Sequence, residues 1–415
     1  MDSLPPSLLH AFDTLKFHAK DAISAISGCI CQQQTKLKIN GRTFQIMKVL
    51  GEGGFSFVYL AQDETSGREF ALKKIYCPTG QDGVKEAMRE VEAYRRFKHP
   101  NIIRILDSAV LQDSDGEGKI VYLFLPVYKR GNLQDAINTH TQNGSHFSER
   151  QMLRLFKGTC EAIRAMHMYR APASAGAGSS KRTPARAPHS DEDDDADEMF
   201  PHPEGDAAGG YSYGGEGDTS ASVPLVSRQR MDEGDVVFDG DEEVTPSGNA
   251  GAGEIVPYAH RDLKPGNVMI ADDGVTPILM DFGSCMKARI SIENRSQALV
   301  QQDLAAEQST MAYRAPELFD VKTGVALDEK VDIWSLGCVL FALAYLHSPF
   351  ENMQTTEQGG SIAMAVLNAR YKHPASNYSQ GFKSLIDSML KVDPKDRPDI
   401  NQVLDTVTAL LQNAR

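Results

Sequence analysis

Hydrophobic and polar positions along this chain change their period several times, and each change marks a new segment. From Phe44 the pattern alternates and is rich in β-branched residues on both sides of a glycine turn, which predicts two strands over residues 44–58. A third strand is expected at Phe70–Ile75, and a helix where the spacing becomes helical from Val84 to Phe97. The continuous apolar run Val121–Leu125 is typical of a buried strand.

Helical patterns dominate the rest of the chain. A helix is expected to begin near Asn132, and another runs from Ser148 to about Met168 with apolar residues on one face. A strand at Ile278–Met280 and a stretch of helix formers at Glu293–Gln308 follow. The uncharged run Ile333–Leu346 is too short to span a bilayer, so it is expected to form a buried core helix. An amphipathic helix closes the chain.

The stretch Ala171–Pro257 interrupts this pattern. It is rich in Ala, Ser, Gly and Pro, and it contains the acidic run Asp191–Glu198. With so few apolar residues it cannot bury enough surface to offset its chain entropy, so we expect a disordered acidic insertion and not a second domain. A solvated spacer and a binding segment for a basic partner are both open interpretations, and the first is favoured.

The net charge of the chain belongs to this insertion. Of the formal charge of −13, the insertion supplies −14, from 19 acidic and 5 basic residues, which leaves +1 for the remainder. At 415 residues, with 41% hydrophobic and 24% charged residues, the chain can form one large two-lobed domain or two ordinary ones. No nucleic-acid partner is expected.

The N-terminal 43 residues are expected to attach the protein to a membrane. Apolar residues recur at helical spacing between Leu4 and Ile26, and Cys29 and Cys31 follow directly. Two thiols beside an amphipathic helix suit reversible S-acylation, and two acyl chains anchor a protein stably. The alternatives are a helix that packs on the body of the protein, and ordinary free thiols. Asp2 excludes N-myristoylation.

The spacing of the cysteines and the N-terminal sequence both indicate a cytosolic protein. The six cysteines form no disulfide framework and no paired Cys-x-x-Cys metal site, which fits a reducing cytosol. No basic segment leads into an apolar run at the N-terminus, so no secretory signal is expected.

The stretch His260–Asn267 carries three groups that suit phosphoryl transfer. Asp262 can accept the proton of an attacking hydroxyl, Lys264 can neutralise charge on the phosphoryl group, and the amide oxygen of Asn267 suits Mg²⁺. A solvated surface turn with accidental charges is the simpler alternative. Its sequence context decides against that alternative.

Groups suited to nucleotide phosphates occur on both sides of this stretch. The glycines of Gly51–Gly54 let backbone N–H groups approach phosphates, although Ser56 takes the place of the third glycine of the usual pattern. Lys73 can pair with phosphates, and Glu90 on the following helix can hold Lys73, unless it is an ordinary surface residue. Asp281, at the end of a strand, can hold Mg²⁺ together with Asn267.

With these motifs in this order, the chain resembles a eukaryotic protein kinase from about Phe44 to Leu411. The resemblance implies an α+β, two-lobed fold with an N-lobe at 44–125, a hinge at 126–131 and a C-lobe at 132–411. It implies catalytic roles for Asp262, Lys264, Asn267 and Thr310, and it makes Leu125 the gatekeeper. The implied nucleotide-binding residues are Gly51, Glu52, Gly53, Gly54, Val58, Ala71, Lys73, Glu90, Leu125, Pro126, Tyr128 and Asp281.

Two further implications concern structure and substrate. Glu317 is expected to pair with Arg397, and Lys73 with Glu90. Lys264 and Thr310 together are typical of the serine/threonine branch.

Within that branch the chain is similar to the serine/threonine kinase 16 family of the Numb-associated kinase group, which includes fungal vacuolar relatives. The matching words include Leu50–Ser56, Tyr258–Pro265, Ser296–Leu299 and Thr310–Leu318. This similarity implies palmitoylated cysteines, a helical activation segment and a place on Golgi or vacuolar membranes. The family's lipidated N-terminal glycine is replaced by Asp2. The long insertion is foreign to the compact members of the family, but it should be tolerated because the entropic cost of closing a surface loop rises only slowly with its length.

The function expected from the sequence is therefore transfer of the γ-phosphoryl group of ATP to Ser and Thr hydroxyls of proteins, with Mg²⁺ as cofactor. Autophosphorylation and a role in membrane traffic on the cytosolic face of Golgi or vacuolar membranes are part of this expectation. The alternative is a pseudokinase scaffold that recruits partners through the acidic insertion. Such scaffolds usually lack one of the five residues Lys73, Glu90, Asp262, Asn267 and Asp281, and here all five are present.

Overall fold

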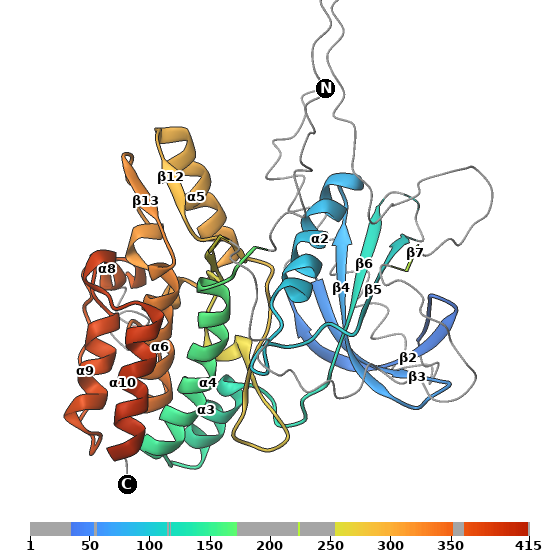
Figure 1. Cartoon of the computed structure of the whole chain (residues 1–415). Coiled ribbons are helices and arrows are strands. Elements are labelled where there is room, and N and C mark those ends of the chain that lie inside the picture. Colours follow the sequence, from blue (N-terminus) through green and yellow to red (C-terminus); the bar gives the residue numbers. More distant parts are fainter. Residues whose placement is uncertain are drawn as a thin grey trace, which may run out of the picture.

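The computed structural model describes residues 35–53, 56–113, 116, 118–171, 223–224, 254–351 and 361–413. These residues form two lobes, a β-sheet with one helix and a larger, mainly helical body (Figure 1). The α+β, two-lobed fold expected from the sequence is confirmed.

The smaller lobe is built on one antiparallel sheet. Its strands follow the spatial order β1-β2-β3-β4-β6-β5-β7. Their bounds are β1 Lys36–Ile39, β2 Arg42–Glu52, β3 Ser56–Asp63, β4 Glu69–Cys77, β5 Asp107–Gln112, β6 Lys119–Leu125 and β7 Val223–Pro224. The helix of this lobe, α2 (Gln81–Arg96), packs on β4 and β6.

The sheet begins earlier than the sequence analysis expected. The predicted kinase domain began at residue 44, but β1 already pairs with β2 from Lys36, through a turn at Asn40 and Gly41 that has φ angles of 51° and 77°. Positive φ at both central residues is what a two-residue hairpin needs, and Asn-Gly is the dipeptide that adopts it most readily. Residues 36–43, which the sequence analysis placed in the N-terminal segment, thus include a strand that pairs with the sheet.

The two faces of the sheet pack differently because side chains alternate along each strand. The outer face carries an aromatic cluster in which Phe44, Phe70 and Phe124 have ring centroids 4.9 to 6.0 Å apart. The opposite face packs on α2 and turns toward the other lobe, with Leu123 and Leu125 in the main core. This second face borders the candidate site.

The larger lobe is helical. Its helices are α3 Leu133–Gln142, α4 Glu149–His167, α5 Arg295–Gln308, α6 Lys330–Tyr345, α8 Ile362–Leu367, α9 Gln380–Met389 and α10 Ile400–Asn413. Side chains of Asn132 and Ser148 cap the starts of α3 and α4, which places both helices where the sequence predicts them. In α6, every residue from Val331 to Tyr345 is buried, as expected for a core helix.

Short elements connect these helices. They are the strands β8 Tyr258–Ala259, β9 Val268–Ile270, β10 Pro277–Leu279, β11 Met286–Lys287, β12 Ile290–Ile292 and β13 Val325–Leu327, and the 3₁₀ turns η1 Pro265–Asn267, η2 Met311–Tyr313, η3 Pro316–Leu318 and η4 Pro394–Asp396. Helix α5 lies between β12 and η2 and projects beside the β12–β13 pair (Figure 1). The helix expected at 293–308 is thus present, although it starts two residues later.

The expected ion pair between Glu317 and Arg397 is confirmed. Arg397 Nη1 and Nη2 lie 2.7 and 2.8 Å from the two carboxylate oxygens of Glu317. The guanidinium also donates to the carbonyl oxygens of Lys330, Lys391 and Val392. Each of its N–H groups therefore has an acceptor, although the residue is buried. This fork joins η3 to η4 next to α6.

Most of the expected insertion lies outside the described residues, as do the expected N-terminal helix, Cys29 and Cys31. The ends of the insertion are described, and they meet: Arg170 and Ile255 form an antiparallel bridge, and Ala171 N–H donates to Glu254 O at 3.0 Å. Both ends therefore lie at the C-terminal end of α4. Within the described part of the chain, no helix combines the length and apolar character needed to cross a membrane.

Candidate active site

The loop from His260 to Asn267 is held in place by one buried carboxylate, that of Asp332 on α6. Asp332 accepts hydrogen bonds from the backbone N–H of His260 (2.8 Å) and of Arg261 (2.9 Å), and His167 Nε2 lies 3.0 Å from it. Asp332 has no exposed surface. The bonds fix the start of the loop against the core helix of the lobe.

Arg261 shows how tightly this loop is constrained. Its φ angle of 69° is left-handed, a conformation that costs a non-glycine residue on the order of 1 kcal/mol or more. Its side chain is buried, and Nη1 donates to Gln301 Oε1 on α5 at 2.8 Å. Burial lowers the pKa of Arg261, and the carboxylate of Asp332 opposes that change. The loop is thereby tied to α5 as well as to α6.

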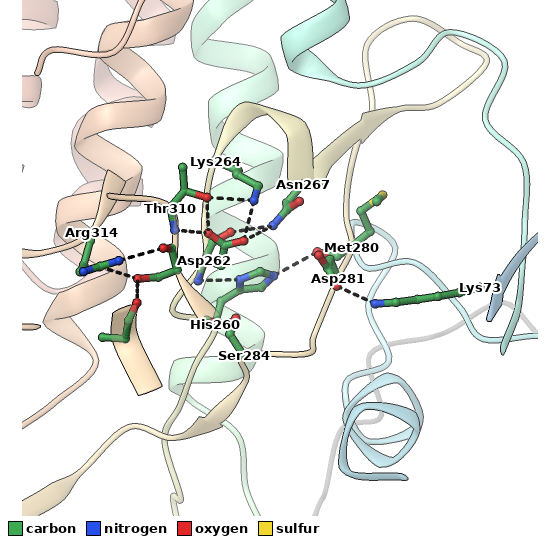
Figure 2. A network of polar contacts seen from close by, with 12 residues as sticks. Lys73, His260, Asp262, Lys264, Asn267, Met280, Asp281, Ser284, Thr310 and Arg314 are labelled. Carbon is green, nitrogen blue, oxygen red and sulfur yellow. Dashed lines mark hydrogen bonds and ion pairs between the residues drawn. The ribbon is translucent and has the colours of Figure 1, made fainter. Parts of the chain in front are cut away.

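The carboxylate of Asp262 is the centre of the polar network in Figure 2. Its Oδ1 accepts bonds from the backbone N–H (2.9 Å) and the hydroxyl (2.8 Å) of Thr310. Its Oδ2 accepts from Lys264 Nζ at 2.8 Å and from Asn267 Nδ2 at 3.1 Å. Lys264 also reaches the Thr310 hydroxyl at 2.9 Å, so the four predicted catalytic residues contact one another.

Asn267 and Asp281 are brought together by the backbone. Met280 N–H donates to Asn267 O at 3.0 Å, and Asp281 follows directly after it. Asn267 donates through Nδ2 to the carbonyl oxygen (2.8 Å) and the carboxylate of Asp262, which leaves its Oδ1 as the acceptor. Asp281 uses Oδ1 for Lys73, and among the described residues no protein donor contacts its Oδ2. A carboxylate oxygen and an amide oxygen are hard donors of the kind that suits Mg²⁺.

Lys73 on β4 links the two lobes. Its Nζ lies 2.7 Å from Glu90 Oε1 on α2 and 2.9 Å from Asp281 Oδ1. The predicted Lys73–Glu90 ion pair is confirmed, and Glu90 is a buried residue and not an ordinary surface glutamate. Figure 2 shows Lys73 reaching Asp281 from the sheet lobe.

The charges in this cluster change the proton affinities of its members. The ammonium of Lys73 lowers the pKa of Asp281 to about 2, although burial acts in the opposite direction. Burial alone would lower the pKa of Lys73, but attraction by Asp281 and Glu90 outweighs it and raises that pKa well above its usual value. Burial raises the pKa of Glu90, and Lys73 opposes the rise. Asp281 is therefore ionised throughout the physiological range.

Asp281 is held in an unusual conformation by residues that the sequence analysis did not single out. Its φ angle is 66°, and its backbone N–H donates to the Tyr94 hydroxyl at 3.2 Å. The ring of Phe282 packs edge-on against Tyr94, with centroids 4.9 Å apart, and lies 5.4 Å from His260. Tyr94 stands one helical turn after Glu90, so the two residues share a face of α2. This spacing is the signal in the sequence that could have placed Tyr94 near the site.

Several of the expected nucleotide-binding residues share one face of the sheet. Gly51 pairs with Val58, Val58 with Lys73, and Ala71 with Leu125. Directly paired residues point to the same face, and so do positions two apart on one strand. This face is therefore the one that carries Lys73.

A cleft of about 490 Å³ lies between the two lobes. Predicted site residues that line it are Gly53, Lys73, Glu90, Asp262, Lys264, Asp281 and Thr310. Those that border the sheet or the hinge without lining this cleft are Gly51, Glu52, Val58, Ala71, Leu125, Pro126 and Tyr128, and Asn267 lies behind Asp262. Gly54 lies outside the described residues.

The chain turns back at Gly53, between β2 and β3. Gly53 N–H donates to Ser56 O at 2.8 Å, and a Cβ on residue 53 would come within 2.8 Å of the Ser56 hydroxyl oxygen. A side chain at residue 53 would therefore require the Ser56 hydroxyl to move.

Arg314 fixes the end of α5 next to Thr310. Its Nε donates to the Ser309 hydroxyl at 2.8 Å, and its Nη2 donates to Ser309 O at 3.0 Å. A cation at the C-terminus of a helix satisfies free carbonyl groups and interacts favourably with the helix dipole. Arg314 was quoted as part of a motif, but nothing in the sequence revealed its contact with the helix end.

Comparison with known proteins agrees with this geometry. The family model for the protein kinase domain matches residues 44–171 and 257–407. The match is interrupted where the sequence analysis expects an insertion.

Individual relatives match over most of their length. Serine/threonine-protein kinase ENV7 of Saccharomyces cerevisiae is 32% identical over 398 residues, which cover 92% of this chain and 96% of the relative. Serine/threonine-protein kinase ppk13 of Schizosaccharomyces pombe is 32% identical over 89% of this chain and 91% of the relative. Human serine/threonine-protein kinase 16 is 32% identical over 92% of this chain and 94% of the relative.

Proposed function

Because the chain belongs to the protein kinase family, and within it to the serine/threonine kinases, we propose that its cleft transfers the γ-phosphoryl group of ATP to Ser and Thr hydroxyls of proteins, itself included. One observation supports this most. Lys73, Glu90, Asp262, Asn267 and Asp281 come from separate parts of the sequence. Lys73 contacts Glu90 and Asp281, Asn267 contacts Asp262, and all of them except Asn267 line one cleft.

The sheet side of the cleft positions the nucleotide. Glu90 holds the Lys73 ammonium at 2.7 Å, so Lys73 faces the phosphates in one orientation. Asp281 and the amide oxygen of Asn267 would hold Mg²⁺. When bound, Mg²⁺ neutralises charge on the phosphate oxygens. The adenine lies against the face that carries Val58 and Ala71.

The helical side of the cleft handles the attacking hydroxyl. Asp262 accepts its proton, and a positioned general base of this kind contributes about 10² to 10⁴ in rate. Lys264 lies 2.8 Å from Asp262 and offers a positive charge to the phosphoryl group as it moves. Thr310 donates to Asp262 through both its amide and its hydroxyl, and so orients the carboxylate.

Autophosphorylation with labelled ATP tests this proposal. Asp262→Asn keeps the size of the side chain and removes the base, so we expect labelling to fall by about 10²-fold or more. Asp405→Asn, an exposed position on α10, is the matched control and is expected to label like the wild type. Equal labelling of wild type and Asp262→Asn would refute the role of Asp262.

The location we propose is the cytosolic face of Golgi or vacuolar membranes, with a role in membrane traffic. What supports it is the sequence: Cys29 and Cys31 follow an amphipathic stretch and stand only a few residues before β1. Two acyl chains on these thiols would hold the protein stably, whereas one would not.

Fractionation tests the membrane proposal. The double variant Cys29→Ser with Cys31→Ser is expected to move the protein from the membrane pellet to the supernatant, and each single variant is expected to shift it in part. Cys285→Ser, at a partly exposed cysteine of the helical lobe, is the control. An unchanged distribution of the double variant would exclude acylation of this pair as the anchor.

The alternative of an inactive scaffold has no specific observation in its favour. A scaffold of this fold usually lacks one of the five polar residues. Here all five are present, four of them line the cleft, and Asn267 contacts Asp262. The comparison of wild type with Asp262→Asn also separates the two functions.

A further inference from the structure

Helix α4 exposes a basic stripe along its whole length. Charged residues that recur every three or four positions lie on one face of the helix, and they are Arg150, Arg154, Lys157, Glu161 and Arg164. The other charged residue of α4 that is not buried, Glu149, accepts hydrogen bonds from Ser379. Lys157 and Glu161 pair with each other at 2.6 Å. Within the described ranges, the three arginine side chains have no ion-pair or hydrogen-bond partner. We call these three arginines and Lys157 the basic stripe.

The basic stripe ends in a pocket at the N-terminal end of α4. The pocket has a volume of about 200 Å³ and is lined by Ser148, Arg150, Gln151, Arg154 and Leu155 of α4, and by Gly274 and Val275 of the turn between β9 and β10. Arg150 and Arg154 stand one helical turn apart on its wall. Leu155 is a buried apolar residue, and Val275 is 51% exposed.

A third arginine lies near this pocket, and the acidic residues nearby are Asp272 and Asp273 of the turn and Glu149 of α4. Arg130 lies against the same turn, with its Cζ 3.1 Å from where a Cβ of Gly274 would be, and its Nε donates to Asp272 O at 2.8 Å. The nearby Asp273 carboxylate is already used within the turn, by the N–H groups of residues 275 and 276 at 2.9 Å. The positive end of the α4 dipole adds to the field of the arginines.

We propose that this pocket and the basic stripe bind the acidic run Asp191–Glu198 of the same chain. The run has seven carboxylates in eight residues, so its charge complements the stripe. Arginine binds carboxylates through two parallel hydrogen bonds, and three arginines here are free to do so. The proposal concerns a binding surface distant from the cleft and does not depend on the proposed catalytic function.

The connectivity of the chain makes this contact accessible. The insertion leaves the lobe at Ala171, at the C-terminal end of α4, and returns there at Glu254. Helix α4 has 19 residues and is thus about 29 Å long. The 19 residues 172–190 that precede the acidic run can span up to about 63 Å at 3.3 Å per residue.

The basic stripe runs from this exit point to the pocket, so the attraction extends along the whole path. Because both partners belong to one chain, the effective concentration of the run is on the order of millimolar, and weak pairs suffice for binding. A second copy and an anionic membrane surface are other possible occupants with the same charge, and the experiment separates them.

Limited proteolysis of the full chain with an enzyme that cleaves after glutamate tests the proposal. Glu192 and Glu198 lie in the acidic run, and Glu216 and Glu233 are reference sites in the same insertion. We expect Arg150→Glu with Arg154→Glu to speed cleavage at the first two sites about fivefold, which equals ~1 kcal/mol at 1.4 kcal/mol per factor of ten. Cleavage at the reference sites is expected to stay the same.

Two controls make the result specific. Arg89→Glu with Arg370→Glu changes the net charge equally, at exposed positions on α2 and just after α8, and is expected to leave all sites unchanged. Arg150→Gln with Arg154→Gln adds no new cleavage site and is expected to repeat the acceleration. Salt of about 1 M, at which charges are screened beyond about 3 Å, is expected to accelerate cleavage of the wild type.

A second set of substitutions tests the pairing itself. Replacing the four aspartates 193, 194, 195 and 197 with asparagine keeps both cleavage sites and removes most of the charge. If run and pocket bind each other, combining these changes with the arginine substitutions gives no further acceleration.

Three results would overturn the proposal. The first is equal cleavage of the wild type and both arginine variants. The second is protection that increases with protein concentration, because it would place the run on another copy of the chain. The third is arginine-dependent sedimentation with phosphatidylserine vesicles while cleavage rates stay unaffected, which would assign the surface to a membrane.

Discussion

The carboxylate of Asp332 holds the loop that carries Asp262, so replacing Asp332 tests whether this buried contact determines the geometry of the candidate site. Asp332 Oδ2 accepts from His260 N–H and contacts His167, and Oδ1 accepts from Arg261 N–H. A hydrogen bond to a charged group contributes about 1.5 to 3 kcal/mol, and each buried donor that is left without a partner costs about 1 to 3 kcal/mol. We expect Asp332→Ala to lower the free energy of unfolding by about 4 to 5 kcal/mol.

Asp332→Asn is expected to cost less, because it can keep one of the two oxygen positions. If the amide oxygen takes the place of Oδ2, the NH₂ group faces Arg261 N–H, and the bond of 2.9 Å is lost. That costs about 2 to 3 kcal/mol. Since this bond holds Arg261 at a φ angle of 69°, the loop that carries Asp262 should relax and kcat should fall. A tenfold decrease in kcat corresponds to an increase of about 1.4 kcal/mol in the activation free energy.

Urea denaturation and steady-state kinetics measure the two effects separately. Cys338→Ala, a buried position on the same helix without a bond to the loop, is the control and is expected to lower stability with little change in kcat. A wild-type kcat in Asp332→Asn would contradict the reasoning, and so would an equal loss of kcat in both variants.

The dependence on pH gives a further check on Asp332. Burial alone would raise its pKa, but the hydrogen bond and positive charge of His167 and the backbone bonds outweigh burial and lower it. A folded-state pKa below the unfolded value of about 3.9 contributes stability above that pH, and the contribution is lost as pH falls through the folded-state pKa. The stability difference between wild type and Asp332→Asn should thus be full at neutral pH and shrink only in strong acid.

Four further outcomes are expected. Glu317→Ala leaves a buried guanidinium unpaired and should lower the free energy of unfolding, measured by urea denaturation, by about 3 to 5 kcal/mol. The double variant Glu317→Leu with Arg397→Met should lower it by less. A loss in the double variant equal to the sum of the two single losses would contradict this. Thr310→Val removes the hydroxyl that contacts the base and should lower kcat about tenfold, while Thr310→Ser should stay near wild type; equal kinetics of the two would refute the contact's role. Gln301→Leu removes an acceptor from a buried guanidinium and should lower stability by about 1 to 3 kcal/mol, and Gln301→Glu, which restores an acceptor, should recover it. Because the pKa of Asp281 is about 2, the Mg²⁺ concentration for half-maximal activity should not change between about pH 6 and 8, and a steep change there would show that Asp281 is not the ligand.

The sequence predicted the fold and the contacting polar residues because their signals are local. Helical period and caps located α3 and α4, and the continuous apolar run located α6. The pairing of Lys73 with Glu90 came from the order of motifs and is present at 2.7 Å. Strand β1 was missed although its signal, Asn40–Gly41 between alternating residues, is also local.

Residues that act through long-range contacts could not be predicted in the same way. Asp332 lies 72 residues after His260, whose N–H it accepts, and nothing in the periodicity of a buried helix says that one of its polar residues faces a loop. Tyr94 reaches the backbone of Asp281 across 187 positions. Arg314 and Gln301 are ordinary polar residues in sequence, and only the docking of α5 gives them partners.

The contacts around the cleft also explain how its charged side chains can be held in place without a bound nucleotide. Every charged group that the lobes bring together already has a partner of opposite charge: Asp262 has Lys264, and Lys73 lies between Glu90 and Asp281. Bringing five charges into a partly buried site without such pairing would be prohibitive, since an uncompensated buried charge costs several kcal/mol.

The pairing leaves particular atoms for ligands. In Asp281 the second carboxylate oxygen has no protein donor in the described part of the chain, and in Asn267 both amide contacts go through nitrogen. The backbone bond from Met280 to Asn267 holds the residue before Asp281 against Asn267. That bond is therefore as important for a cation as the side chains themselves, and it is set by the packing of two short strands that no motif describes.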